Sequence, residues 1–94
     1  MQFHIRCVDK ADSGQVRADT RGDHLAYMGS FSDQVILAGP TLSDDGESMT
    51  GSVILLEVPD RAAAEAFSAD DPYNKAGLFE SVQITRFRKT VPAG

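Results

Sequence analysis

His24 is the residue of this sequence best suited to move a proton. It lies in a segment with helical spacing, one turn after Arg21 and one turn before Tyr27 and Met28, at the edge of the face that should pack on a sheet. An imidazole with its ordinary pKa of about 6.5 is a competent general base when a partner fixes one ring nitrogen. A half-buried histidine that only borders the core would show the same spacing, so both interpretations stay open.

Asp71 is the best candidate for that partner. It precedes Pro72, where the backbone is held extended and the carboxylate projects from a fixed frame. The same carboxylate is equally well placed to cap a short helix that begins at Pro72, and one side chain can do both. The sequence therefore predicts a catalytic His24–Asp71 pair, in which Asp71 orients the ring.

Five further residues are candidates for substrate binding. Arg21, or Arg6 from a strand, could neutralise negative charge that develops during a reaction. Tyr73 could donate a hydrogen bond to a ligand, although an aromatic ring there also suits the core. Gly39 and Pro40 could bring the backbone close to a ligand, or could simply end a strand.

The sequence gives no support for metal or nucleotide chemistry. It has two histidines and one cysteine, and no two ligand-type residues stand at zinc spacing. The acidic segment 43–48 lacks the alternating aspartates of a calcium loop, and the glycines do not form G-x-G-x-x-G. Cys7 alternates in phase with Phe3 and Ile5, which favours a small buried residue over a reactive thiol. We expect any reaction to proceed without a metal or an organic cofactor.

The hydrophobic pattern predicts elements in the order strand, helix, strand, strand, helix, strand. The predicted ranges are strand 2–8, helix 14–31, strand 34–38, strand 52–58, helix from 61 and strand 82–87. Ser13 and Asp60 are the candidate N-caps of the two helices, and Gly22 predicts a kink or break near 21–23. Gly39-Pro40 is expected to end the second strand and to open a surface loop at 41–49. Pro72 should begin a short helix that reaches about residue 78.

This order is the ferredoxin-like βαββαβ pattern, an α+β fold with helices on one face of a four-stranded antiparallel sheet. Its first and third strands are central. The uncovered face is expected to carry Ile54 and Leu56, with His4 and Arg6 beside them. Because such an apolar patch needs a cover, we predict a symmetric homodimer packed sheet to sheet.

Chain length and net charge limit the number of domains and the kinds of partner further. The 94 residues suit a single domain over 1–94, and 9 basic against 14 acidic residues give a net charge of −5, which argues against a nucleic-acid partner. No apolar run approaches the roughly 20 residues of a membrane span, and residues 1–6 do not resemble a signal peptide. Together with a single cysteine, these features predict a cytoplasmic protein.

The chain resembles the YCII-related (YciI-like) proteins through an ordered set of short motifs along nearly its whole length. These are R-x-x-H-L at 21–25, L-A-G-P at 37–40, Gly51 before an apolar strand, D-P-Y at 71–73 and A-G-L-F-E at 76–80. The resemblance implies a dimeric α/β barrel built from ferredoxin-like protomers. It also implies that the paired histidine and aspartate of the family correspond to His24 and Asp71, within a cleft.

The resemblance leaves the reaction open. One relative is similar to enzymes that eliminate chloride from a chlorinated hydroxyquinol, and muconolactone isomerase shares the barrel architecture, but a shared fold does not transfer a reaction. The first hypothesis is a small-molecule enzyme, a dehydrochlorinase-like lyase or an isomerase, in which a His-Asp pair acts on a small cyclic or aromatic substrate. The alternative is a non-catalytic module that binds a small molecule or serves dimerisation.

Overall fold

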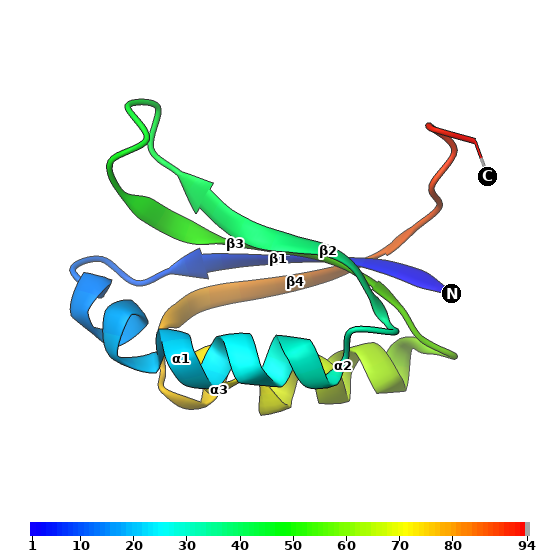
Figure 1. Cartoon of the computed structure of the whole chain (residues 1–94), viewed down its shortest axis with the longest axis horizontal. Helices are drawn as coiled ribbons and strands as arrows, with labels where there is room; N and C mark the ends of the chain where they lie inside the picture. The colour runs from blue at the N-terminus through cyan, green and yellow to red at the C-terminus, as the bar shows by residue number, and fades with distance from the viewer. Residues whose placement is uncertain (94) are drawn as a thin grey trace.

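Strands and helices follow one another in the predicted order, including the short helix that begins at Pro72. The computed structural model describes residues 1–93, and Figure 1 shows its path. The elements are β1 (Gln2–Asp9), α1 (Gly14–Ser30), β2 (Val35–Leu42), β3 (Met49–Glu57), α2 (Arg61–Asp70), α3 (Pro72–Lys75) and β4 (Phe79–Phe87).

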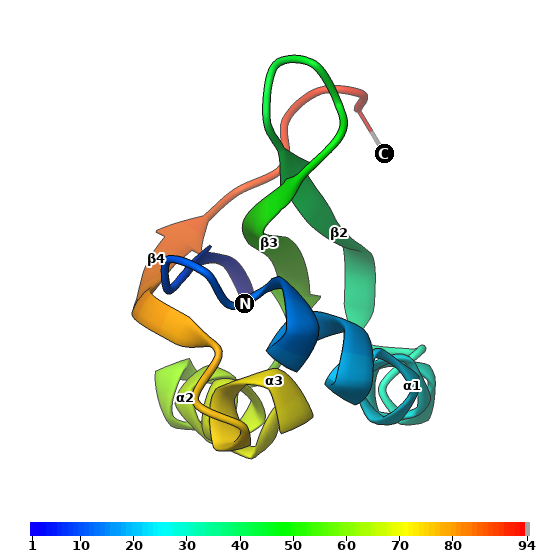
Figure 2. The ribbon, with the colours of Figure 1, turned by 90° about the vertical axis from the view of Figure 1, so that its left-hand side faces the viewer.

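The strands form one antiparallel sheet in the order β2-β3-β1-β4. The first and third strands are central, as predicted. All three helices lie on one side of the sheet, and the other side carries no helix (Figures 1 and 2). This is the ferredoxin-like α+β protomer of the dimeric α/β barrel class. In residues 1–93 no helix has both the length and the apolar character to cross a membrane.

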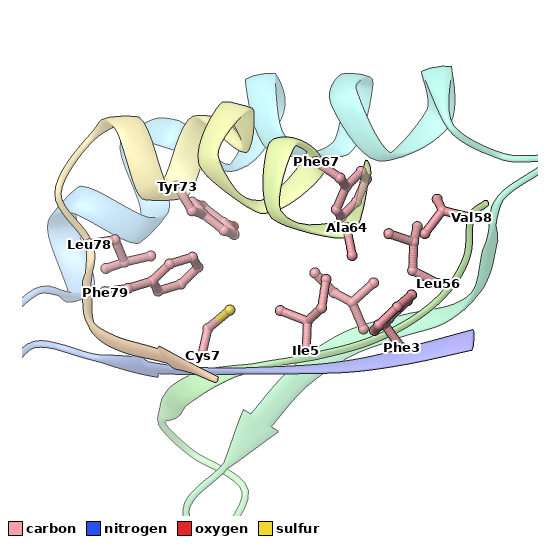
Figure 3. Close-up of a cluster of buried hydrophobic side chains, with 11 residues drawn as sticks. Phe3, Ile5, Cys7, Leu56, Val58, Ala64, Phe67, Tyr73, Leu78 and Phe79 are labelled. Carbon is pink, nitrogen blue, oxygen red and sulfur yellow. The ribbon is translucent and has the colours of Figure 1, made fainter. Parts of the chain in front are cut away.

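The core fills the space between the sheet and the helices. Phe3, Ile5 and Cys7 point from β1 toward the helices (Figure 3), and each is at most 2% exposed. Their alternation along the strand is the pattern that predicted β1. Ala64 and Phe67 of α2 reach the same layer from the opposite side.

The prediction that Ile54 and Leu56 lie on the uncovered face is wrong. They are 2% and 0% exposed and belong to the core. In the sheet Ile54 pairs with Ile5, and Leu56 pairs with Phe3, and cross-strand partners share a face. The uncovered face carries Val53 and Leu55 instead, because side chains alternate along a strand. Four consecutive apolar residues do not show which of them face the core. The register with the neighbouring strand decides this.

Several predicted boundaries also change. β3 begins at Met49 instead of 52, and β4 begins at Phe79 instead of 82. Helix α1 runs unbroken from Gly14 to Ser30, so the expected break at Gly22 is absent. β2 continues through Gly39-Pro40 to Leu42, which shortens the loop to 43–48. A proline is tolerated there because β2 is an edge strand, where the missing N–H breaks no ladder bond. The helix from Pro72 ends at Lys75, short of 78.

Gly51 permits the close approach of the two central strands where they leave the core. A Cβ atom built on Gly51 would collide with the backbone oxygen of Cys7. Only glycine therefore fits at this position without separating β3 from β1. The next residue, Ser52, is paired with Cys7 and consequently faces the helices.

Candidate functional site

His24 and Asp71 form a buried pair between helix α1 and the start of α3. The Nδ1 atom of His24 lies 2.9 Å from Oδ1 of Asp71, and their side chains are 12% and 3% exposed. An ionised carboxylate only accepts hydrogen bonds, so Nδ1 is the donor and the lone pair of the neutral ring lies on Nε2. Nε2 makes no hydrogen bond within residues 1–93.

Asp71 holds its place through the helix that follows it. Its Oδ1 also accepts the backbone N–H of Tyr73 at 3.0 Å, and it is therefore the N-cap of α3. The two roles that the sequence left open for this carboxylate, cap and histidine partner, are thus both present. The ring of Tyr73 in turn stacks on His24, with centroids 4.0 Å apart and planes inclined by 17°. The hydrogen bond to Asp71 therefore fixes the position of Nδ1, and the stacking on Tyr73 fixes the plane of the imidazole ring.

A cavity of about 230 Å³ adjoins this pair. Its walls come from α1, β2, β3 and α3, and include His24, Arg21, Gly39, Pro40 and Tyr73. A cavity of about 150 Å³ is enough to hold benzene, so this space suits one substituted six-membered ring. Apolar side chains of Leu25, Met28, Met49 and Ile54 complete much of the wall.

Arg17 is the unexpected residue of the site. It is 6% exposed and lines the same cavity. Its Nε and Nη2 atoms donate to the two carboxylate oxygens of Asp9 at 2.8 and 2.9 Å, and Nη2 also donates to the backbone oxygen of Gly51 and to Ser52 Oγ. The guanidinium carbon lies 4.6 Å from the centroid of the Tyr73 ring, a cation–π contact. The arginine thus ties α1 to β1, β3 and α3.

The charges around the site act on two nearby groups. Burial alone lowers the pKa of Arg17, but the hydrogen bond and negative charge of Asp9, with a contribution from Tyr73, outweigh it and raise the pKa above its usual value. Burial raises the pKa of the Cys7 thiol to about 12, and the charges of Asp71 and Asp9 add to this effect. Cys7 is accordingly a neutral core residue.

The structure brings six of the seven predicted site residues together. His24, Arg21, Gly39, Pro40 and Tyr73 line the cavity, and Asp71 contacts His24. Arg6 is not among them. It is exposed and alternates with the buried Ile5 and Cys7, so it lies on the uncovered face of the sheet.

Sequence reasoning missed Arg17 and Ser52. Arg17 precedes Arg21 by four residues and His24 by seven, which is one face of a helix, and this spacing could have placed it beside them. The apolar residue next to it, Val16, is 36% exposed, so hydrophobicity does not mark the buried position of this turn. Ser52 gave no comparable signal, because its burial depends on the register of β3 against β1.

The part of the chain that the structure describes, residues 1–93, holds no cluster of three metal-ligand side chains. The acidic segment 43–48 closes the β2–β3 hairpin through its own hydrogen bonds. Asp45 Oδ1 accepts from the Ser43 hydroxyl and the Glu47 backbone, which lowers the pKa of that exposed carboxyl.

Residues 1–88 match the sequence model of the YCII-related domain family. The chain belongs to this family. It is 34% identical over 96 residues to protein YciI of Escherichia coli O6:H1 (strain CFT073), with 95% of this chain and 98% of that protein covered. An uncharacterized protein of Haemophilus influenzae is 28% identical over the same length.

Two solved structures share the fold of this chain. The 5-chloro-2-hydroxyhydroquinone dehydrochlorinase TftG from Burkholderia phenoliruptrix AC1100, in complex with 2,5-dihydroxybenzoquinone, superposes with a TM-score of 0.89 at 33% identity, and each chain is fully covered. A NIPSNAP domain protein from Burkholderia xenovorans has a TM-score of 0.55 at 17% identity and shares the fold alone.

Proposed function

We propose that this protein is a small-molecule enzyme in which His24, oriented by Asp71, acts as a general base on a small cyclic or aromatic substrate. The observation that carries the proposal is the 2.9 Å contact between the two side chains at the wall of the cavity of about 230 Å³. The likeness to TftG over the full chain supports a reaction of the same type, an elimination or isomerisation.

The proposed chemistry follows from the donor and acceptor pattern. Asp71 accepts the Nδ1 hydrogen, so the Nε2 lone pair takes a proton from a hydroxyl or an acidic carbon of the substrate. The electron pair left on the substrate then expels a leaving group such as chloride or shifts a double bond. The protonated ring is stabilised by the buried carboxylate, and such a base contributes about 10²- to 10⁴-fold. No step requires a metal or an organic cofactor.

The active assembly in this proposal is a homodimer formed through the uncovered sheet face. Leu37 pairs with Leu55 across β2 and β3, with Val53 nearby, and Leu37 is 52% exposed in the single chain. His4 and Arg6 flank these apolar side chains on β1. A second copy would cover the patch and close the α/β barrel. The buried thiol of Cys7 suits a reducing cytoplasm.

Chloride release tests the enzymatic proposal. Wild-type protein is incubated with 5-chloro-2-hydroxyhydroquinone, and chloride is measured by ion chromatography beside His24→Gln and Asp71→Asn. Asp70→Asn is the matched control, because that exposed carboxylate is adjacent in sequence and forms no hydrogen bond or ion pair with His24. We expect release by wild type and the control, and a loss of at least about 100-fold in the two site variants.

The result also separates the alternative function. Release that persists in His24→Gln would refute the base assignment. A wild-type chain that binds 2,5-dihydroxybenzoquinone but releases no chloride would favour the non-catalytic binding module.

A second measurement tests the dimer. Leu55→Glu should give a particle of about the 10.1 kDa chain mass by light scattering, and Val16→Glu on the outside of α1 should not change the mass. A monomeric wild type at micromolar concentration would contradict the sheet-to-sheet assembly.

A further inference from the structure

Ser52 carries a buried hydrogen-bond donor that the protein itself does not use. The residue is 4% exposed and lines the cavity beside His24. Its Oγ lies 3.0 Å from Arg17 Nη2. A guanidinium donates and never accepts, so Ser52 is the acceptor in this bond, and its own hydroxyl hydrogen is left over. Within residues 1–93 the Ser52 hydroxyl donates no hydrogen bond.

A buried donor without an acceptor destabilises the folded protein. A polar hydrogen that is buried without an acceptor costs roughly 1–3 kcal/mol, and native proteins seldom leave one unsatisfied. Asp9 and the Gly51 carbonyl accept from Arg17, and neither is hydrogen-bonded to the Ser52 hydroxyl. The cavity is therefore the place where its acceptor would bind.

We propose that Ser52 is the oxygen-binding residue of the cavity, donating its hydroxyl hydrogen to an anionic oxygen of a small planar ring such as a phenolate or enolate. Arg17 is a positioning residue, because its Nη2 fixes Ser52 Oγ and so aims the hydroxyl. This inference rests on the proposed function, for which it names the substrate class. His24 removes the proton, and Ser52 binds an oxygen on which the resulting charge resides.

The charge on the cavity wall favours an anion over a neutral ring. The two fully charged side chains that line the cavity, Arg17 and Arg21, are both cationic. Arg17 is neutralised by Asp9, but Arg21 forms no ion pair within residues 1–93. In an acidic protein with a net charge of −5, this cavity wall thus carries one cation, Arg21, that has no ion pair within residues 1–93.

The test compares two ligands of the same ring that differ in ionisable oxygen. One is 2,5-dihydroxybenzoquinone, whose hydroxyls are acidic because they are vinylogous carboxylic acids. The other is 2,5-dimethoxybenzoquinone, which cannot ionise. Dissociation constants for both are measured by titration calorimetry on wild type, Ser52→Ala and Ser52→Cys, with Ser81→Ala as control because Ser81 is an exposed serine of β4.

We expect wild type to prefer the dihydroxy ligand and Ser52→Ala to bind it about 10- to 100-fold more weakly. The dimethoxy ligand should lose little, and Ser81→Ala should match wild type. Ser52→Cys, which keeps the shape with a much weaker donor, should lose affinity several-fold and serves if Ser52→Ala does not fold.

Three results would overturn the assignment. These are equal binding of the dihydroxy ligand by wild type and both variants, an equal loss for the two ligands, and no binding of either by wild type. The proposed function is judged separately, because it fails if His24→Gln retains chloride release, whatever Ser52 does. A His24→Gln variant that binds the dihydroxy ligand normally but releases no chloride would support the proposed function.

Discussion

Replacing Asp71 with asparagine should separate the two roles of this carboxylate. An asparagine oxygen can still accept the Tyr73 N–H, so the N-cap of α3 should survive. The same Oδ1 atom contacts His24 Nδ1, so the asparagine oxygen that keeps the cap also still accepts from the ring, but without the negative charge. The imidazolium that forms when Nε2 accepts a proton would then lack the carboxylate that stabilises it.

The size of the effect follows from the burial of the pair. With side chains 12% and 3% exposed, the His24–Asp71 bond is shielded from water, and a hydrogen bond to a charged group contributes about 1.5–3 kcal/mol. A double-mutant cycle of Asp71→Asn with His24→Gln should therefore show a coupling energy of about 1–3 kcal/mol. Activity should fall far more than stability, by about 10²- to 10⁴-fold.

Urea unfolding followed by circular dichroism supplies the four free energies of unfolding. All samples are kept at one protein concentration, because association would shift the apparent stability. Asp70→Asn, measured in the same cycle with His24→Gln, provides the uncoupled baseline. A coupling energy below about 0.5 kcal/mol for Asp71, or equal to that of Asp70, would refute the claim that the carboxylate steers the ring.

Three further substitutions test the surroundings of the site. Arg17→Met should lower the free energy of unfolding by about 3–5 kcal/mol, because Asp9 is left as a buried unpaired charge. The double variant Arg17→Met with Asp9→Leu should recover much of this loss. No recovery would contradict the explanation. Gly51→Ala should lower the free energy of unfolding in urea by about 1–3 kcal/mol, because the added Cβ collides with the Cys7 carbonyl. Gly39→Ala is the control, because its added Cβ meets nothing within 4 Å and stability should not change. Equal losses in the two variants would argue against the collision. The folded protein keeps the Cys7 thiol protonated to about pH 12, but an unfolded chain releases that proton near pH 9.0. The free energy of unfolding should therefore fall as pH rises above 9, by up to about 1.4 kcal/mol per pH unit. Urea unfolding of Cys7→Ala measured across that pH range should lack this decrease. Parallel curves for the variant and wild type would exclude the thiol as its cause.

Local sequence patterns were sufficient to predict the order of the strands and helices and many residues of the candidate site. Alternation predicted β1, and the spacing of His24 relative to Arg21 placed both on one helix face. The proline after Asp71 fixed the frame of that carboxylate. These features depend on residues close together in the chain, which is why a sequence can show them.

Features that depend on pairing between distant segments could not be predicted in this way. The phase of β3, and with it the burial of Ile54, is set by alignment with β1 nearly fifty residues earlier. The burial of Arg17 follows from a carboxylate on β1 and acceptors on β3 that only the folded chain assembles. A charged residue in a short polar segment gives no local sign of such partners.

The walls of the cavity come from four elements that are far apart along the chain, and the His24–Asp71 contact alone spans 47 positions. A ligand in this space would therefore bind only the native state, and each bound molecule would oppose global melting. A compound at one hundred times its dissociation constant would add about 2.7 kcal/mol to the free energy of unfolding, or very roughly 10–20 °C in a domain of this size. A thermal-shift survey of small oxygenated rings could consequently rank candidate substrates before any product has been identified.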